Sequence, residues 1–136
     1  SITNTRLTVN AKIGNSEPLH ASSVGKCLLA FMDKSDSKRV IERMPLESFT
    51  EKTITDKTKL EMELESVKKI GFAVDDGEIS PYIRCIAAPI FNHLGKVIYS
   101  LGISGPAIRI DRQKIEIISP KLLETAKEIS RQLGYQ

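Results

Sequence analysis

Two polar side chains near the ends of two largely apolar runs could do chemistry together. Cys85 lies near the start of the apolar run Tyr82–Phe91, and Ser104 closes the second run, Lys96–Ser104. The four residues between the runs include Gly95, and two apolar runs around such a short break predict a β-hairpin. Because the strands of a hairpin are antiparallel, their outer ends meet. We therefore expect the Cys85 thiol and the Ser104 hydroxyl to lie side by side at one end of a sheet.

Both faces of this predicted hairpin are expected to be covered. Side chains along a strand point alternately to the two faces of a sheet. One set in the first run contains Ile83, Cys85, Ala87 and Pro89, and the other contains Arg84, Ile86, Ala88 and Ile90. Both sets are mostly apolar, which is typical of a strand in the middle of a sheet that is covered on both sides.

A predicted helix start offers hydrogen-bond donors. The helix runs to about Met32, and Ser22 or Ser23 is the expected N-cap. Gly25 in its first turn costs about 1 kcal/mol relative to alanine, which predicts that another group approaches the backbone there. The free amides and the dipole of a helix start favour an anion. Ordinary capping is the alternative interpretation of the same residues.

Asp75 supplies a carboxylate at the end of a short predicted strand, Phe72–Asp75. A carboxylate in this place could accept hydrogen bonds from a hydroxylated ligand. The alternative is an aspartate that only turns the chain, which suits its position just before Asp76 and Gly77.

Cys85 could also be a nucleophile, with His20 or His93 as its base. No spacing supports this arrangement, and His93 falls at the hairpin turn, at the far end from Cys85. A cysteine in an apolar strand is more often a small buried hydrophobe. A Cys-dependent enzyme is therefore the weaker alternative.

The chain lacks the motifs of several other functions. Its Cys and His residues show no pair at the spacing of a zinc site. It has no phosphate-binding glycine loop, no serine elbow, and no basic stretch interleaved with aromatic residues. We expect no metal, no cofactor and no nucleic-acid surface.

The remaining segments predict three more helices and one more strand. The strand covers Thr3–Ile13, and the helices cover about 35–44, 57–70 and 111–134. For the second of these helices, Asp56 is the expected cap and Gly71 the expected left-handed end. Its apolar stripe contains Leu60, Leu64, Val67 and Ile70. Helices that cover a central antiparallel sheet make an α+β domain.

Pro120 lies inside the last helical pattern and leaves two alternatives. It either kinks one helix by removing a hydrogen bond, or Ser119 caps a new helix with Pro120 at its first position.

Bulk composition indicates one ordinary globular domain. A chain of 136 residues can bury a core, and 40% hydrophobic with 27% charged residues is typical of soluble proteins. A net charge of +3 is too small to indicate a nucleic-acid partner. No apolar run is long enough to span a membrane, and two cysteines are too few for a disulfide framework. We expect a cytoplasmic protein, and the strand-like pattern at Ser1–Thr3 suggests a fragment of a longer one.

Five segments together resemble a known family. They read PLHASSVGKCLLA at 18–30, GFAVDD at 71–76, RCIAAPIF at 84–91, LGISGP at 101–106 and ISRQLGY at 129–135. Their order and spacing, from Leu7 to Tyr135, resemble the effector-binding domain of isocitrate-lyase-regulator (IclR) type bacterial transcription factors.

The resemblance implies a fold, a function and partners. The fold is GAF-like or profilin-like, a curved antiparallel sheet flanked by helices. The function is to sense a small organic acid without catalysis, as a homodimer or homotetramer. Operator DNA is bound by an N-terminal winged helix-turn-helix that these 136 residues lack, so we expect no DNA binding by this chain alone. A pure oligomerisation module with a vestigial pocket is the alternative.

The resemblance also implies which residues line the ligand pocket. Its polar groups would be the backbone amides of Ser23 and Val24 and the side chains of Asp75, Cys85 and Ser104. Its apolar lining would be Ile83, Leu28 and Met32.

Three departures from the family pattern predict a larger or differently oriented acid than the smallest keto acids. Gly102 replaces the first of two hydroxyls, which removes a hydrogen bond and leaves room. Tyr82 stands where the family often has glycine, and Gly77 stands where it has a second acid.

Overall fold

The protein is organised around a four-stranded antiparallel sheet with the order β1-β4-β3-β2. A computed structural model describes residues 6–10, by their backbone, and residues 17–136. The strands are β1 (Arg6–Asn10), β2 (Ala73–Asp76), β3 (Ile83–Phe91) and β4 (Val97–Pro106). The predicted first strand, Thr3–Ile13, lies outside the described residues except for Arg6–Asn10.

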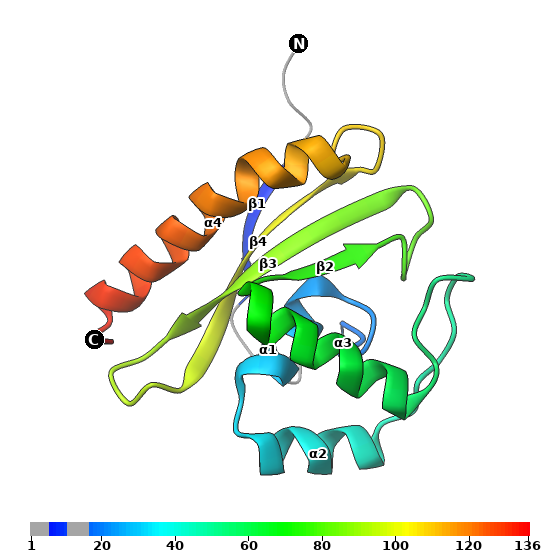
Figure 1. Ribbon diagram of the computed structural model, residues 1–136, viewed down its shortest axis with the longest axis horizontal. Coiled ribbons are helices and arrows are strands. Elements are labelled where there is room, and N and C mark those ends of the chain that lie inside the picture. Colours follow the sequence, from blue (N-terminus) through cyan, green and yellow to red (C-terminus); the bar gives the residue numbers. More distant parts are fainter. Residues whose placement is uncertain (1–5, 11–16) are drawn as a thin grey trace.

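Four helices cover this sheet unequally, as Figure 1 shows. They are α1 (Ser23–Phe31), α2 (Lys34–Arg43), α3 (Lys57–Ile70) and α4 (Arg112–Gln132). One face of the sheet contacts α1, which in turn carries α2 and α3, and α4 packs on the opposite face. The predicted α+β class, a sheet flanked by helices, is confirmed.

The predicted hairpin is confirmed, and it lies in the middle of the sheet. β3 pairs with β4 on one side and β2 on the other. The turn is held by the Asn92 side chain, whose Oδ1 accepts from the amides of Leu94 and Lys96 at 2.9 and 3.0 Å. Gly95 completes it with a φ of 75°, which L side chains rarely adopt.

Both faces of the hairpin are covered, as the alternating apolar sets predict. One hydrophobic cluster joins Ala73, Ala87 and Val97 of the sheet to residues of α1 and α3. The other joins Ile86, Ala88, Ile90 and Leu101 to Leu122 and Ala126 of α4. Neighbouring residues of β3 therefore belong to different cores.

Sequence also located the helix caps. Ser22 caps α1 by accepting from the Gly25 amide at 2.9 Å, and Asp56 caps α3 by accepting from the Lys59 amide at 2.9 Å. Gly71 ends α3 with a φ of 105°. The backbone at this position is in the left-handed region, which glycine enters without the steric penalty that a Cβ would bring.

One expectation about a helix is corrected, and the alternative left open at Pro120 is decided. Ile70 does not continue the buried stripe of α3, because it is the last residue of the helix and is 56% exposed. No new helix starts at Pro120, since α4 runs through it and Ser119 is a buried residue inside the helix.

Within residues 6–10 and 17–136, no helix has the length and hydropathy needed to cross a bilayer.

Candidate functional site

Three of the predicted site residues form one row across the sheet. In the register of the strands, Asp75 of β2 lies opposite Cys85 of β3, and Cys85 lies opposite Ser104 of β4. Residues directly opposite each other share a face of the sheet. The Cys85 Sγ lies 3.3 Å from the Ser104 Oγ, which confirms the expected pairing of thiol and hydroxyl. We call Asp75, Cys85 and Ser104 the polar row; on β1 the register continues it to Arg6.

The start of α1 points toward the end of the sheet that carries this row. At the other end of the helix, the rings of Phe31 and Phe91 are 5.9 Å apart and edge to face. Cys27, in the middle of α1, lies beside Ser100, whose partner in the register is Pro89. A helix rises about 1.5 Å per residue, so its first residues lie further along β3, toward Cys85.

The first two amides of α1 have no hydrogen-bond acceptor among the described residues. The Oγ of the N-cap Ser22 accepts from the Gly25 amide, and its backbone oxygen accepts from the Lys26 amide. Within the described part of the chain, no group accepts a hydrogen bond from the amide of Ser23 or Val24. The first turn contains no acidic side chain that would meet the positive end of the helix dipole. This end of α1 can therefore accommodate a negative charge.

Gly25 has a packing reason of its own. A Cβ at this position would lie 2.5 Å from the Leu19 Cα and 2.6 Å from the Leu19 oxygen. The expected close approach to the Gly25 backbone is confirmed, and the group that approaches is the chain just before α1.

Asp75 is buried, and its environment disfavours its charge. Only 4% of the residue is exposed, and its Oδ1 accepts from the Glu78 amide at 2.8 Å. Burial raises the pKa of Asp75 to about 6; the hydrogen bond from the Glu78 amide opposes this, and the Glu78 charge adds to it. This carboxyl group therefore gains or loses its proton about two pH units above the range usual for an aspartate.

Sequence reasoning missed the most buried charge near the site. Lys26 is fully buried, and its Nζ donates to both carboxylate oxygens of Glu78 at 2.8 and 2.9 Å. It also donates to Glu63 Oε2 at 3.0 Å and to the Val74 oxygen at 2.6 Å. One signal was available, because Lys26 is the only charged residue in the sequence of α1.

Three of the other predicted pocket residues lie near the polar row or in the core beside it. Gly102 is buried and lies opposite Ala87, on the same face as Cys85 and Ser104. Ile83, also on that face by alternation, is 36% exposed at the start of β3. Leu28 is 1% exposed and belongs to the hydrophobic core that α1 shares with α3 and the sheet.

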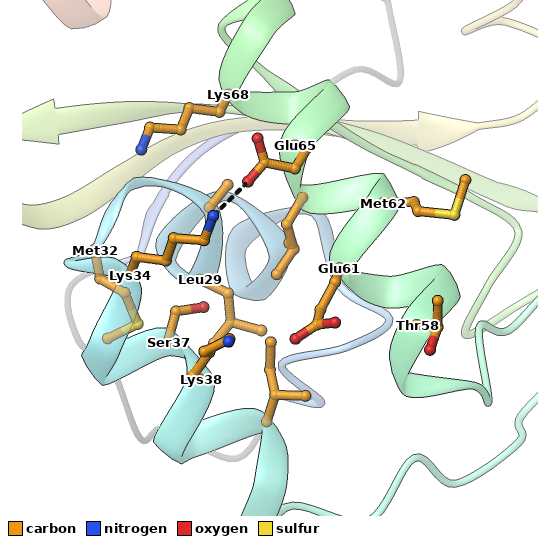
Figure 2. A pocket seen from close by; sticks show the side chains of 13 residues that line it. Leu29, Met32, Lys34, Ser37, Lys38, Thr58, Glu61, Met62, Glu65 and Lys68 are labelled. Atoms are coloured by element: carbon orange, nitrogen blue, oxygen red, sulfur yellow. Dashed lines mark ion pairs between the residues drawn. The ribbon is translucent and has the colours of Figure 1, made fainter.

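Two predicted lining residues are not brought to the row. Tyr82 precedes β3 and is 79% exposed. Met32 follows the last residue of α1, at the end away from Ser23. It lines a separate groove between α1, α2 and α3, shown in Figure 2.

This groove has an apolar floor and a charged rim. Its volume is about 340 Å³, and Leu29 and Ile41 belong to its lining. Lys34 of α2 and Glu65 of α3 form an ion pair of 3.8 Å across it, drawn as the dashed line in Figure 2. A second cavity, of about 570 Å³, lies between the end of β3 and the end of α4, beside Phe91 and Tyr135. Neither cavity includes a member of the polar row in its lining.

The surroundings of Cys85 do not suit a nucleophile. Burial, assisted by the charges of Asp75 and Glu17, raises the pKa of its thiol. A reactive cysteine needs the opposite shift. His20, one candidate base, is engaged through its Nε2 with the Glu47 oxygen at 2.8 Å. Within the described residues, no three Cys, His, Asp or Glu side chains are grouped as a metal site would require.

Comparisons with known proteins agree with one another. A family model described as "Bacterial transcriptional regulator IclR C-terminal" matches residues 1–131. The chain is 39% identical to the HTH-type transcriptional regulator BhcR of Paracoccus denitrificans over 117 residues, which are 86% of this chain and 42% of BhcR. It therefore spans less than half of that relative's length.

Solved structures extend the comparison to the fold. The crystal structure of the C-terminal domain of the Escherichia coli regulator KdgR superposes with a TM-score of 0.87 and 32% identity, covering 96% of this chain and 88% of that one. The inducer-binding domain of PobR from Acinetobacter, a double mutant in complex with 3-hydroxybenzoic acid, superposes with a TM-score of 0.78 and 30% identity, covering 87% and 68%.

Proposed function

This chain belongs to the IclR family of bacterial transcriptional regulators, of which it forms the C-terminal effector-binding domain, and we propose that it senses a small organic acid. The similarity to the PobR domain, whose structure contains an aromatic acid, supports this class of ligand. In the full-length regulator, we propose, an N-terminal winged helix-turn-helix binds operator DNA. The sensing domain then acts without catalysis, in keeping with relatives that are named as transcriptional regulators.

The observation that carries the proposal is the polar row at the end of the sheet toward which the start of α1 points. The Ser23 and Val24 amides and the Ser104 hydroxyl are the donors proposed for the carboxylate of the acid, with the Cys85 thiol beside them. Hydrogen bonds to a charged group contribute about 1.5–3 kcal/mol each. Two or three of them suit a total of about 4–8 kcal/mol, which corresponds to millimolar to micromolar affinity.

The shape of the row favours an acid with more than two or three carbons. Gly102 and Ala87, the pair next to Cys85 and Ser104 on this face, have no side chain beyond a Cβ. Because Gly102 replaces a hydroxyl of the family pattern, we propose that a ring or a sugar chain extends along this face, and that a sugar acid or an aromatic acid fits better than pyruvate. Asp75 would then meet a hydroxyl group of the ligand or, when protonated, an oxygen acceptor.

Binding must favour one arrangement of the assembled protein over another if it is to regulate. We propose that the domain forms a homodimer or homotetramer and that the acid binds one of its geometries more tightly. The shift in operator affinity can be no larger than this difference in binding free energy.

Isothermal titration with pyruvate, glucuronate and 3-hydroxybenzoate tests the proposal. We expect heat from at least one of the two larger acids, and Ser104→Ala should weaken that acid at least tenfold because a donor to a charge is lost. Ser66→Ala, on the exposed side of α3, is the matched control and should change nothing. No heat and no thermal shift with any acid would contradict the sensing function; unchanged affinity in Ser104→Ala would remove the row from the site.

A further inference from the structure

We propose that Lys26 and Glu78 are positioning residues of the effector site. They orient the Asp75 side chain and set the charge that Asp75 presents to the effector. This inference rests on the proposed function, because it concerns the site proposed there. Neither residue is a member of the polar row.

Lys26 ties four parts of the fold together. It stands in the first turn and a half of α1, and its Nζ reaches Glu63 of α3, the Val74 oxygen of β2 and the carboxylate of Glu78 in the loop after β2. All these distances lie between 2.6 and 3.0 Å. A fully buried ammonium is tolerated only with such a complete set of acceptors. The start of α1 and the β2–β3 loop are thereby fixed relative to each other.

Glu78 connects this cluster of hydrogen bonds to Asp75. Its own amide donates to Asp75 Oδ1 at 2.8 Å, and its Oε2 accepts from the Asp76 amide at 3.1 Å. Its carbonyl oxygen accepts from Thr53 Oγ1 at 2.5 Å, so the loop is anchored on its outer side too. Within the described residues, no group donates to the second carboxylate oxygen of Asp75. One oxygen of Asp75 is therefore used to orient it, and the other remains for a ligand.

The buried charges around Asp75 do not balance, and this imbalance gives the positioning role a consequence that can be measured. The buried cluster holds one ammonium, Lys26, and two carboxylates, Glu78 and Asp75. Lys26 contacts Glu78 through both oxygens, so Asp75 keeps a surplus negative charge where an anionic effector is proposed to bind. The Glu78 charge raises the pKa of Asp75 and the Lys26 charge lowers it. Removing one or the other should thus move the titration of Asp75 in opposite directions.

Other charged groups near Asp75 do not change this expectation. Asp76, its neighbour in β2, also raises the pKa of Asp75, but it is paired with Arg84 at 2.7 Å on the other face. Glu63 of α3 meets only Lys26 of the cluster and is partly exposed. Glu17, ahead of α1, acts on the Cys85 thiol of β3.

The experiment titrates the Asp75 carboxyl carbon by NMR in the free domain and measures the affinity for 3-hydroxybenzoate by calorimetry from pH 5 to 8. We expect Glu78→Gln to lower the Asp75 midpoint by about one pH unit and Lys26→Met to raise it by a similar amount. Glu63→Gln is the matched control, since it also loses a contact to Lys26, and should leave the midpoint within about 0.3 unit. The pH at which the affinity changes should move with the midpoint.

The outcomes are separable. In one outcome the wild type binds the acid, and the pH at which its affinity changes is the same in Glu78→Gln. That result overturns the positioning role and leaves the sensing function standing. An Asp75 midpoint that stays in place in Glu78→Gln also overturns it, whether or not Lys26→Met folds. If the wild type binds none of the acids, both proposals fail together.

Discussion

The two faces of the sheet are built from alternate residues of the same strands and differ in what they bury. On the α4 face, β3 contributes Ile86, Ala88 and Ile90, and no charged side chain among the described residues is buried there. On the α1 face lie all three buried charged residues of the described chain, which are Lys26, Asp75 and Glu78. The α4 face is thus stabilised mainly by apolar burial, whereas the α1 face also buries charged side chains beside a candidate ligand site.

This difference has an energetic explanation. Burying an apolar side chain contributes about 1.5–3 kcal/mol, whereas a buried ion pair recovers little beyond its own desolvation cost. A charged cluster therefore needs another reason to be kept, and on the α1 face the polar row and the free amides of α1 provide one. If that explanation is right, changes on the α4 face should affect folding alone, and changes on the α1 face should affect binding as well.

The largest expected effect is from Lys26→Met. Removing the ammonium leaves Glu78 buried without a counter-charge, so we expect the free energy of unfolding to fall by about 3–5 kcal/mol. Urea unfolding measures it. Lys34→Met is the matched control, because the Lys34 ammonium is exposed and pairs, among the residues that the structure describes, only with Glu65, at 3.8 Å. This variant should unfold like the wild type. Equal stability of the two variants would show that the buried pair is not what holds the α1 face together.

Ile86→Ala should have the next largest effect, on the opposite face. Ile86 is completely buried against α4, and its truncation should cost about 3 kcal/mol in unfolding free energy. Calorimetry with 3-hydroxybenzoate at a temperature where the variant is folded should give the wild-type affinity within about twofold. A tenfold loss would mean that the two faces are not independent.

A smaller effect is expected from the pH dependence of stability. The folded-state pKa of Asp75 is raised from 3.8 to about 6, so the native state binds the proton more tightly than the unfolded state. The contribution of this group to stability is therefore full below pH 4 and is lost as the pH rises to about 6, by roughly 2–3 kcal/mol. Asp75→Asn cannot titrate, and the stability difference between it and the wild type should change over this window only. A stability difference that stays constant from pH 4 to 7 would contradict a raised pKa of Asp75 in the folded state.

The smallest expected effect concerns the two thiols of the α1 face. Burial raises the pKa of Cys27 to about 12 and also raises that of Cys85. With a disulfide reagent at pH 7.5, Cys85 should react about tenfold or more slowly than free cysteine, and Cys27 should react only on unfolding. Fast labelling of Cys85 would support the alternative in which the chain is a Cys-dependent enzyme.

The fold could be predicted well because its signals are local. The two runs around Gly95 predicted the hairpin, and Ser22, Asp56 and Gly71 marked the helix ends, since caps and turns depend on residues a few positions apart. Ile70 was assigned wrongly because periodicity cannot tell where a stripe stops meeting the core.

The candidate site was predicted only in part. The pairing of Cys85 with Ser104 follows from the hairpin, and alternation puts both on one face. Lys26 was missed because a lysine is exposed by default, and its acceptors, Glu63 and Glu78, lie 37 and 52 residues away in the sequence. A single sequence contains no local signal for contacts over such separations.

The most direct test of the central claim is a crystal structure of the domain with whichever of glucuronate and 3-hydroxybenzoate gives more heat in titration. We expect density for its carboxylate between the amides of Ser23 and Val24 and the side chains of Cys85 and Ser104. Density instead in the groove between α1, α2 and α3, or in the cavity beside Phe91 and Tyr135, would contradict it.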